Sequence, residues 1–183
     1  MDKAKTFEPS RAWRILVFLS VGATVLGLDR FTKSVVRSTI AVTGENVPVI
    51  PEILSFRFVA NIGAAFSMGE GMGDMFALFA AIVVCAIAVY LCRAPRVSRV
   101  ETFGLALMAG GAIGNAIDRI LLGYVVDFIA TDFISFPVFN VADIGITCGV
   151  VLAFIGFMFL SPATRDDAGA ERDGQASDSE DTR

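Results

Sequence analysis

The stretch MFALFAAIVVCAIAVYLC, residues Met75–Cys92, contains no charged side chain. Its length is close to the roughly 20 apolar residues that an α-helix needs to cross the hydrocarbon layer of a membrane. Three further apolar runs flank it, Ile15–Leu28, Thr102–Leu122 and Val138–Leu160. The first of these can span only if its helix continues through residues 29–36 into the headgroup layer. The sequence therefore predicts a membrane protein that is mainly α-helical, with four transmembrane helices.

The composition of the whole chain agrees with a membrane protein. Hydrophobic residues make up 55% of the 183 residues, and sixteen are Phe; a soluble domain of this length needs more polar surface. The net charge of −4 arises in residues 161–183, which hold seven acidic and three basic residues. This segment has almost no large apolar residue, so it is predicted to be a disordered cytoplasmic tail.

The residue types that are missing exclude several kinds of enzyme. The chain has no His, which rules out Ser-His-Asp and Cys-His catalysis and the HExxH zinc site. Its three cysteines, Cys85, Cys92 and Cys148, are odd in number and lack metal-ligand spacing, so neither a disulfide framework nor a zinc site is expected. No metal and no cofactor is predicted, and any hydrolysis must use carboxylates, Lys or hydroxyl groups.

Basic residues predict the orientation of the helices. Lysines and arginines precede the first apolar run and fill the connection between the second and third, where they are Lys3, Lys5, Arg11, Arg14, Arg93, Arg96 and Arg99. Cytoplasmic loops carry such an excess of basic residues. Both termini, residues 1–14 and 161–183, are therefore predicted to be cytoplasmic. No small-residue cleavage site follows the first run, so it is interpreted as an uncleaved span.

The segment of about residues 38–70 is then predicted to lie outside. Residues Val47–Ala60 are rich in Val, Ile and Phe, partly alternate with polar residues, and include Pro48 and Pro51. This pattern favours short β-strands on the outer membrane face, forming a small β-cradle. The stretch NIGAAF, Asn61–Phe66, is expected to turn the chain into an interfacial helix.

Polar residues within or beside the apolar runs share one position: the predicted outer ends of the spans. They come from separate segments and are Asp29, Lys33, Asn61, Asn115, Asp118, Arg119, Asp127, Asn140 and Asp143. Ionisable residues in a membrane segment are costly and mark a functional site by default. Because single residues near the interface cost less, the hypothesis of a site depends on the convergence of several segments.

Structural roles account for some of these residues equally well. Asp29 and Lys33 have the i, i+4 spacing of an ordinary helix ion pair, so a supporting role is favoured over direct chemistry. Asn115, Asp118 and Arg119 share one side of a helix, where they can pair with each other or with the first span. Nearby glycines at 110, 111 and 114 have the spacing that lets helices approach closely.

Asp127 and Asp143 are harder to explain by structure alone, because each lies among apolar residues. The connection between them contains Pro137, which lets the chain turn back, and Asp132, which is interpreted as a solvated loop charge. Two adjacent carboxylates cannot both ionise cheaply, so they share a proton. One can then activate a water while the other protonates the leaving amine. This is the chemistry of an aspartic protease.

The chain resembles lipoprotein signal peptidase, the bacterial signal peptidase II family of aspartic membrane proteases. The resemblance covers about residues 15–160. It depends on Asp29-xxx-Lys33, on NIGAAF, on GGAIGNAIDRILLGYVVDFI at Gly110–Ile129 and on FPVFNVADIG at Phe136–Gly145. Two positions depart from the family pattern. Ala60 stands where members often have a basic residue before the Asn, and the acidic tail has no counterpart.

The resemblance implies a four-helix peptidase domain in the bacterial plasma (inner) membrane, with the active site near the outer face. The implied substrate is a prolipoprotein whose cysteine carries a diacylglyceryl group, cut on the N-terminal side of that cysteine. Membrane lipids are expected as further partners and nucleic acid is not, and the chain is expected to be a monomer. Asp127 and Asp143 match the catalytic pair, and Asp29 and Lys33 match a structural motif. The positions that support the pair or bind substrate are Asn61, Asn115, Asp118, Arg119 and Asn140.

Two other functions fit the same residues. A small transporter or proton pathway would use carboxylates as relays spaced through the membrane. A structural membrane subunit would use the polar cluster only to hold helices together, and it would tolerate Asp127→Asn.

Overall fold

The computed structural model describes residues 9–63 and 69–160. Four helices within these residues are long and apolar enough to cross a membrane. They are α1 (Arg11–Ser38), α3 (Gly73–Arg93), α4 (Arg99–Leu122) and α5 (Val141–Ile155), which the π-helical turn η3 (Gly156–Leu160) continues. The prediction of four spans is therefore confirmed. The predicted tail, residues 1–8 and most of the predicted interfacial helix lie outside the described residues.

The first apolar run can span a membrane only if its helix continues through residues 29–36, and helix α1 does continue through them. It runs without interruption through Asp29 and Lys33 to Ser38, a length of 28 residues. At about 1.5 Å per residue the helix is about 42 Å long, which exceeds the roughly 30 Å of hydrocarbon. The side chain of Ser10 caps its first turn by accepting a hydrogen bond from the backbone N–H of Trp13. The short helix α2 (Ile40–Thr43) follows and ends at Gly44, whose φ is 68°.

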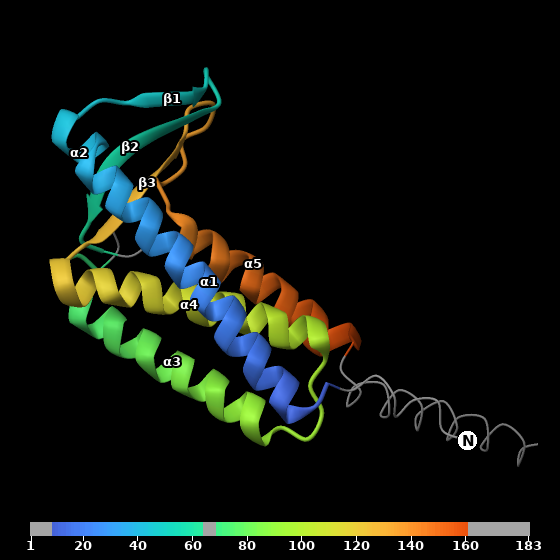
Figure 1. Ribbon diagram of the computed structural model, residues 1–183. Helices are drawn as coiled ribbons and strands as arrows, with labels where there is room; N and C mark the ends of the chain where they lie inside the picture. Colours follow the sequence, from blue (N-terminus) through green and yellow to red (C-terminus); the bar gives the residue numbers. More distant parts are fainter. Residues whose placement is uncertain (1–8, 64–68, 161–183) are drawn as a thin grey trace, which may run out of the picture.

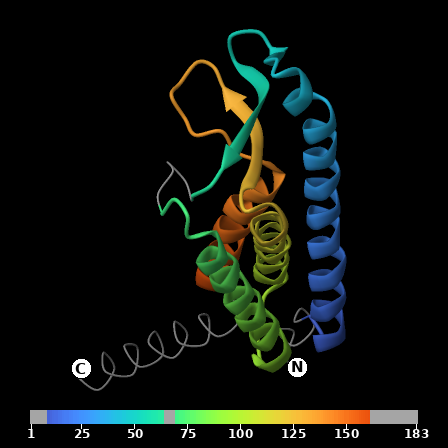
Figure 2. The same ribbon diagram turned by 90° about the vertical axis from the view of Figure 1, so that its left-hand side faces the viewer.

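Helix α4 occupies the centre of the bundle, with α1, α3 and α5 around it (Figures 1 and 2). Glycines on different sides of α4 permit this arrangement. A Cβ atom at Gly110 would lie 2.6 Å from the carbonyl oxygen of Gly22 on α1, and one at Gly111 would overlap the carbonyl oxygen of Ala142 on α5. The backbones of α1 and α5 therefore approach α4 to a distance that side chains would forbid, as the glycine spacing predicts.

A three-stranded antiparallel sheet lies at one end of the bundle (Figure 1). Its strands are β1 (Val47–Ile50), β2 (Leu54–Asn61) and β3 (Val125–Thr131), with β2 in the middle. The first two confirm the strands predicted between residues 47 and 60. Sequence reasoning does not predict β3, because its pairing partner is distant in the chain and β-propensity depends on that context. The run of β-branched and aromatic residues in VVDFIAT is the signal that could have found it.

An apolar cluster fixes the sheet to the end of α1. Val36 and Ile40 pack with Val126 and Phe128 of β3, and all four are buried. Phe128 also meets Phe56 of β2 edge to face, with ring centroids 5.6 Å apart. Since successive strand residues face opposite sides, anchoring Val126 and Phe128 on one face turns the residue between them, Asp127, to the other.

Candidate active site

Asp143 is held by the start of helix α5. Asn140 is the N-cap residue: its side-chain oxygen accepts a hydrogen bond from the N–H of Asp143 at 3.0 Å. In return, Oδ2 of Asp143 accepts the N–H of Asn140 at 3.1 Å. This reciprocal arrangement is a capping box, and the positive end of the helix dipole favours a negative charge there. The local sequence NVAD therefore fixes the carboxylate of Asp143 in place.

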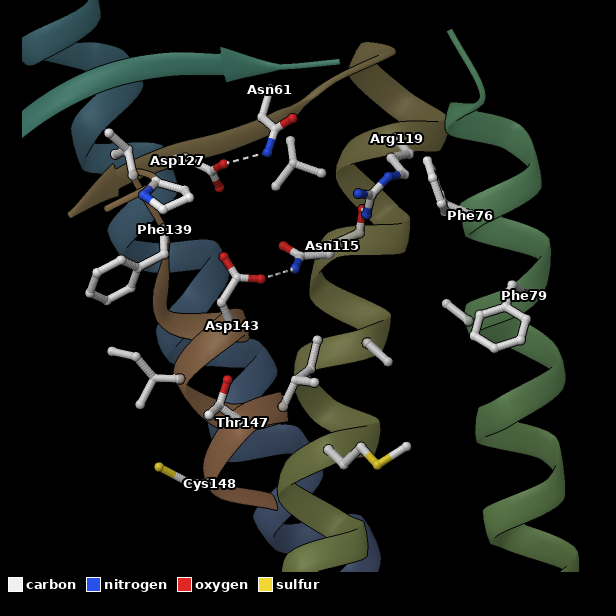
Figure 3. Close-up of a pocket in the computed structure, with 18 of the residues that line it drawn as sticks. Asn61, Phe76, Phe79, Asn115, Arg119, Asp127, Phe139, Asp143, Thr147 and Cys148 are labelled. Carbon is white, nitrogen blue, oxygen red and sulfur yellow. Dashed lines mark hydrogen bonds between the residues drawn. The ribbon is translucent and has the colours of Figure 1, made fainter. Parts of the chain in front are cut away.

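Two asparagines connect Asp143 to Asp127. The Nδ2 group of Asn140 donates to Oδ1 of Asp127 at 2.6 Å and to Oδ1 of Asn115 at 3.1 Å. The Nδ2 group of Asn115 donates to Oδ1 of Asp143 at 2.7 Å. The side chains of Asp127 and Asp143 thus belong to one hydrogen-bonded chain through two amides. Figure 3 shows both carboxylates at the same open space, one from β3 and one from α5.

A buried ion cluster lies behind these amides. The ammonium group of Lys33 lies 2.9 Å from Asp29, 3.0 Å from Asp118 and 2.9 Å from the side-chain oxygen of Asn115. Lys33, Asp29 and Asp118 are all at most 1% exposed. The predicted pair of Asp29 and Lys33 is present, and it also orients Asn115, which contacts Asp143.

The same cluster links elements that the sequence leaves apart. Oδ1 of Asp29 accepts the N–H of Ala142 on α5 at 3.0 Å, and Oδ2 of Asp118 accepts the N–H of Val126 on β3 at 3.1 Å. Arg30 forms an ion pair with Asp118. Arg30 was not among the predicted site residues, although its position directly after Asp29 in an apolar helix was a signal for it. The cluster therefore sets the positions of β3 and α5, which carry Asp127 and Asp143.

Asn61 and Arg119 complete the site at its open edge. The Nδ2 group of Asn61 donates to Oδ2 of Asp127 at 2.8 Å, and its oxygen accepts the N–H of Gly63 at 3.0 Å. Arg119 donates to the carbonyl oxygen of Gly63 at 3.0 Å, and its guanidinium lies over the ring of Phe76 at 5.2 Å. All the predicted site residues are thus brought together in one region.

Asp132 does not take part in this region. It is exposed and follows the end of β3, where it accepts a hydrogen bond from the hydroxyl of Ser55 at 2.9 Å. Its interpretation as an exposed loop charge is confirmed. It also provides a carboxylate in the same segment of the chain that is not part of the site.

The environment of Asp127 changes its acidity. Burial raises its pKa from 3.8 to about 6, and the nearby charge of Asp143 acts in the same direction. Hydrogen bonds from Asn61 and Asn140 and the charge of Lys33 oppose this rise. A carboxyl group with a pKa near the working pH can both accept and release a proton, which is the property that general acid–base catalysis requires.

Asp127 lies where two hollows meet, and Asp143 lines the larger of them. The larger cavity, of about 710 Å³, is lined by α3, α4, α5 and residues 136–139, and its wall is mostly apolar (Figure 3). A second hollow of about 590 Å³ is bounded by the end of β2 and residues 135–138. Asn61 and Asp127 line both. Among residues 9–63 and 69–160, no group of three His, Cys, Asp or Glu side chains has the geometry to hold a metal ion.

Comparisons with known proteins identify relatives along most of the chain. The profile of the family described as signal peptidase (SPase) II matches residues 21–159. The lipoprotein signal peptidase of Geobacillus thermodenitrificans is 41% identical over 151 residues, which cover 81% of this chain and 94% of the relative. That of Latilactobacillus sakei subsp. sakei is 38% identical over 152 residues, covering 83% of this chain and all of the relative.

Solved structures give the same result for the fold. Two structures described as a bacterial membrane enzyme, solved by the in meso method at 2.3 and 1.9 Å resolution, each match with a TM-score of 0.70. Their sequences are 32% and 31% identical to this chain, and the matches cover 77% and 78% of it and 87% and 92% of those chains. The family profile, the sequence relatives and the fold agree, and the chain belongs to the signal peptidase II family.

Proposed function

We propose that the chain is an aspartic endopeptidase that removes the signal peptide from diacylglyceryl-modified prolipoproteins, cutting on the N-terminal side of the lipidated cysteine. Membership of the signal peptidase II family and the names of the relatives support the substrate class. The observation that carries the mechanism is the arrangement of Asp127 and Asp143 at one cavity, joined through Asn140 and Asn115.

In this mechanism the pair of carboxyl groups shares one proton and activates one water molecule. The ionised member removes a proton from the water, and the oxygen of that water attacks the carbonyl carbon of the scissile peptide bond. The protonated member donates its proton to the carbonyl oxygen. A proton then passes to the amide nitrogen of the lipidated cysteine, the C–N bond breaks, and the pair returns to its starting state. The shared proton belongs to Asp127 and Asp143 jointly.

The amide donors give the pair a fixed geometry. Both oxygens of Asp127 accept a hydrogen bond, one from Asn61 and one from Asn140. Each carboxylate oxygen has two lone pairs, so each keeps capacity for the water or the substrate. A catalytic group that is oriented before the substrate binds needs no reorganisation during the reaction. We therefore assign Asn61, Asn115 and Asn140 to supporting the pair, and Lys33 and Asp29 to holding that support.

The two hollows suit the two parts of the substrate. The larger cavity opens among apolar side chains of α3 and α5, such as Phe79 and Ile144, which fit acyl chains. The second hollow lies along β2 and residues 135–138, where an extended peptide can pass Asp127. A lipidated peptide would then place its cysteine at the junction, beside both carboxylates.

The basic residues support the orientation of this site in the membrane. Arg93 and Arg99 lie at the ends of α3 and α4 opposite the sheet (Figure 1). By the excess of basic residues in cytoplasmic loops, this end faces the cytoplasm. The carboxylate pair then lies near the outer face, within a monomer that is surrounded by membrane lipids.

The test is cleavage of a diacylglyceryl-modified prolipoprotein by the purified protein in detergent. We expect Asp127→Asn and Asp143→Asn each to lower turnover by about 10³-fold or more, because either change removes proton transfer. Both variants should insert and fold. Asp132→Asn is the matched control: it changes the same residue type in the same segment and should keep full activity. Near-normal turnover of either dyad variant would show that the assignment is wrong.

A second arm of this experiment tests the substrate. The wild-type protein should leave the same prolipoprotein uncut when its cysteine lacks the diacylglyceryl group. Cleavage of that unmodified chain at a comparable rate would contradict the proposed substrate while leaving the carboxylate mechanism intact.

A further inference from the structure

Thr147 is a polar residue in the apolar part of the larger cavity. It lies on α5 one helical turn after Asp143, and its side chain lines the cavity beside Ile144, Ile146 and Met108 (Figure 3). The polar side chains of the same wall otherwise belong to the carboxylate site, apart from the thiol of Cys148. A hydroxyl group at this depth faces the space where, on the proposed function, the lipid of the substrate would lie.

The hydroxyl of Thr147 differs from those of other helical threonines in this chain. Threonine in a helix commonly donates to the carbonyl oxygen four residues earlier. Thr24, Thr32 and Thr102 do so, at 2.8, 2.9 and 2.9 Å. The hydroxyl of Thr147, in contrast, has no hydrogen-bond partner among the described residues. A donor next to hydrocarbon without a partner is unfavourable, so this hydroxyl is suited to a ligand that brings an acceptor.

We propose that Thr147 donates a hydrogen bond to an ester carbonyl of the substrate's diacylglyceryl group, so that the enzyme prefers ester-linked to ether-linked lipid. This inference rests on the proposed function. An ester carbonyl accepts hydrogen bonds and donates none, which complements a hydroxyl donor. An ether-linked lipid has the same shape along its chains but lacks this carbonyl oxygen.

The spacing along α5 agrees with the chemistry of the substrate. One turn of helix separates Thr147 from Asp143, which is about 5.4 Å along the axis. In the lipidated cysteine, the thioether sulfur and the glyceryl carbons separate the ester carbonyls from the scissile amide by roughly 5–8 Å on ordinary bond lengths. With the scissile bond at the carboxylates, an ester group therefore reaches the level of Thr147, and the acyl chains continue along the apolar wall.

The experiment compares two substrates with one prolipoprotein sequence. One carries a diacylglyceryl group and the other a dialkylglyceryl group with chains of equal length, so that they differ only in the ester carbonyls. We expect Thr147→Val to lower kcat/KM for the diacyl substrate by about 5- to 10-fold, the effect of one lost hydrogen bond. The change should appear in KM with kcat nearly constant, because the contact is remote from the bond that breaks. For the dialkyl substrate, Thr147→Val should change kcat/KM by less than about twofold.

Controls separate this role from simple packing. Thr147→Ser keeps the hydroxyl and should retain the preference for the diacyl substrate. Cys148→Ala alters the next residue in the same cavity wall and should affect both substrates equally. The wild-type preference for diacyl over dialkyl substrate needs no variant and serves as the test if Thr147→Val fails to fold.

Equal loss on both substrates, or no loss on the diacyl substrate, would overturn the proposal. So would a wild-type protein that cuts both substrates equally well. Those results would leave the proposed function intact, since the lipidated prolipoprotein would still be cleaved at the carboxylate pair. Failure of the wild type to cut either substrate would instead overturn the proposed function.

Discussion

Two buried polar clusters lie near opposite ends of helix α4, and they differ in what they border. We call them the sheet-end cluster (Asp29, Lys33, Asn115, Asp118 and Asn140) and the far-end cluster (Arg14, Tyr90, Ser98 and Glu101). In the far-end cluster the hydroxyl of Tyr90 donates to Glu101 at 2.5 Å, and Glu101 also accepts the N–H of Ser98 at 3.3 Å. Arg14 of α1 donates to the carbonyl oxygen of Ala94 at the end of α3 at 2.8 Å.

Both clusters tie helices together, but only one borders a cavity. The far-end residues line neither of the two hollows described above, and their polar groups are directed at each other and at helix ends. The sheet-end cluster instead orients Asp127 and Asp143, which face open space. Burial of polar groups is therefore a poor marker of a catalytic site by itself. Buried groups that hold other polar groups at a cavity are a better one.

The distance between the clusters bears on the alternative of a proton pathway. Residues 102–114 of α4 contain no ionisable side chain, and 13 helical residues span about 20 Å. A relay through the membrane would need groups spaced along that depth. The separation of the two clusters therefore favours a site confined to one end of the bundle.

The largest effect on stability is expected from Lys33→Met. This change leaves Asp29 and Asp118 buried with Arg30 as the remaining cation, and breaking a buried ion pair costs about 3–5 kcal/mol. It also removes a donor to Asn115, so activity should fall with stability. Thermal unfolding in detergent and the rate of cleavage measure the two effects.

The matched control restores the charge balance. In Asp29→Asn/Lys33→Met one acid and one base are both removed, and Asp118 keeps its pair with Arg30. The double variant should therefore be more stable than Lys33→Met alone. If Lys33→Met unfolds at the wild-type temperature, or if the double variant is no better, the ion cluster is not what holds this end together.

The next effect concerns pH. Burial raises the pKa of Asp127 to about 6, so the buried carboxyl keeps a proton at pH values where an ordinary aspartate has lost it. Below that value the pair keeps the one shared proton that the mechanism needs, and above it the pair loses that proton. We expect kcat/KM to fall about tenfold per pH unit above about pH 6, with an apparent pKa that belongs to the pair.

Asn61→Ala tests whether the hydrogen bond from Asn61 influences the pKa of Asp127. The hydrogen bond from Asn61 lowers the pKa of Asp127, so its removal should move the alkaline limb of the profile to higher pH. A wild-type profile that does not fall between about pH 6 and about pH 8 would mean that the pair does not lose its shared proton near the pKa of Asp127. A limb unmoved in Asn61→Ala would show that this bond does not tune the site.

The smallest effect is expected at the far-end cluster. Tyr90→Phe removes one hydrogen bond to a buried carboxylate, so the free energy of unfolding should fall by about 1–2 kcal/mol. The value of kcat should not change, because this cluster does not touch the cavity. Tyr124→Phe is the control, since the hydroxyl of Tyr124 has no hydrogen-bond partner among the described residues. A fall in kcat for folded Tyr90→Phe would show that the two ends are coupled.

Much of the fold could be predicted because its signals are local. Apolar runs and their polar interruptions give the four helices and the two strands of residues 47–60. Strand β3 and the ion pair of Arg30 with Asp118 were not predicted, because both depend on partners far away in the sequence. The hydrogen-bonded link through Asn140 and Asn115 could not be predicted for the same reason. Its residues were expected at the site, but the packing of α4 against α5 determines which amide donates to which carboxylate.

In the proposed mechanism Asp127 and Asp143 act as one unit. The most direct measurement is the single-turnover rate of Asp127→Asn, Asp143→Asn and the double variant on one diacylglyceryl-modified prolipoprotein. Groups that act as a unit have strongly non-additive effects. If the two carboxylates act as one unit, all three rates should agree within about tenfold. A double variant that is slower than the wild type by the full product of the two single losses would contradict it.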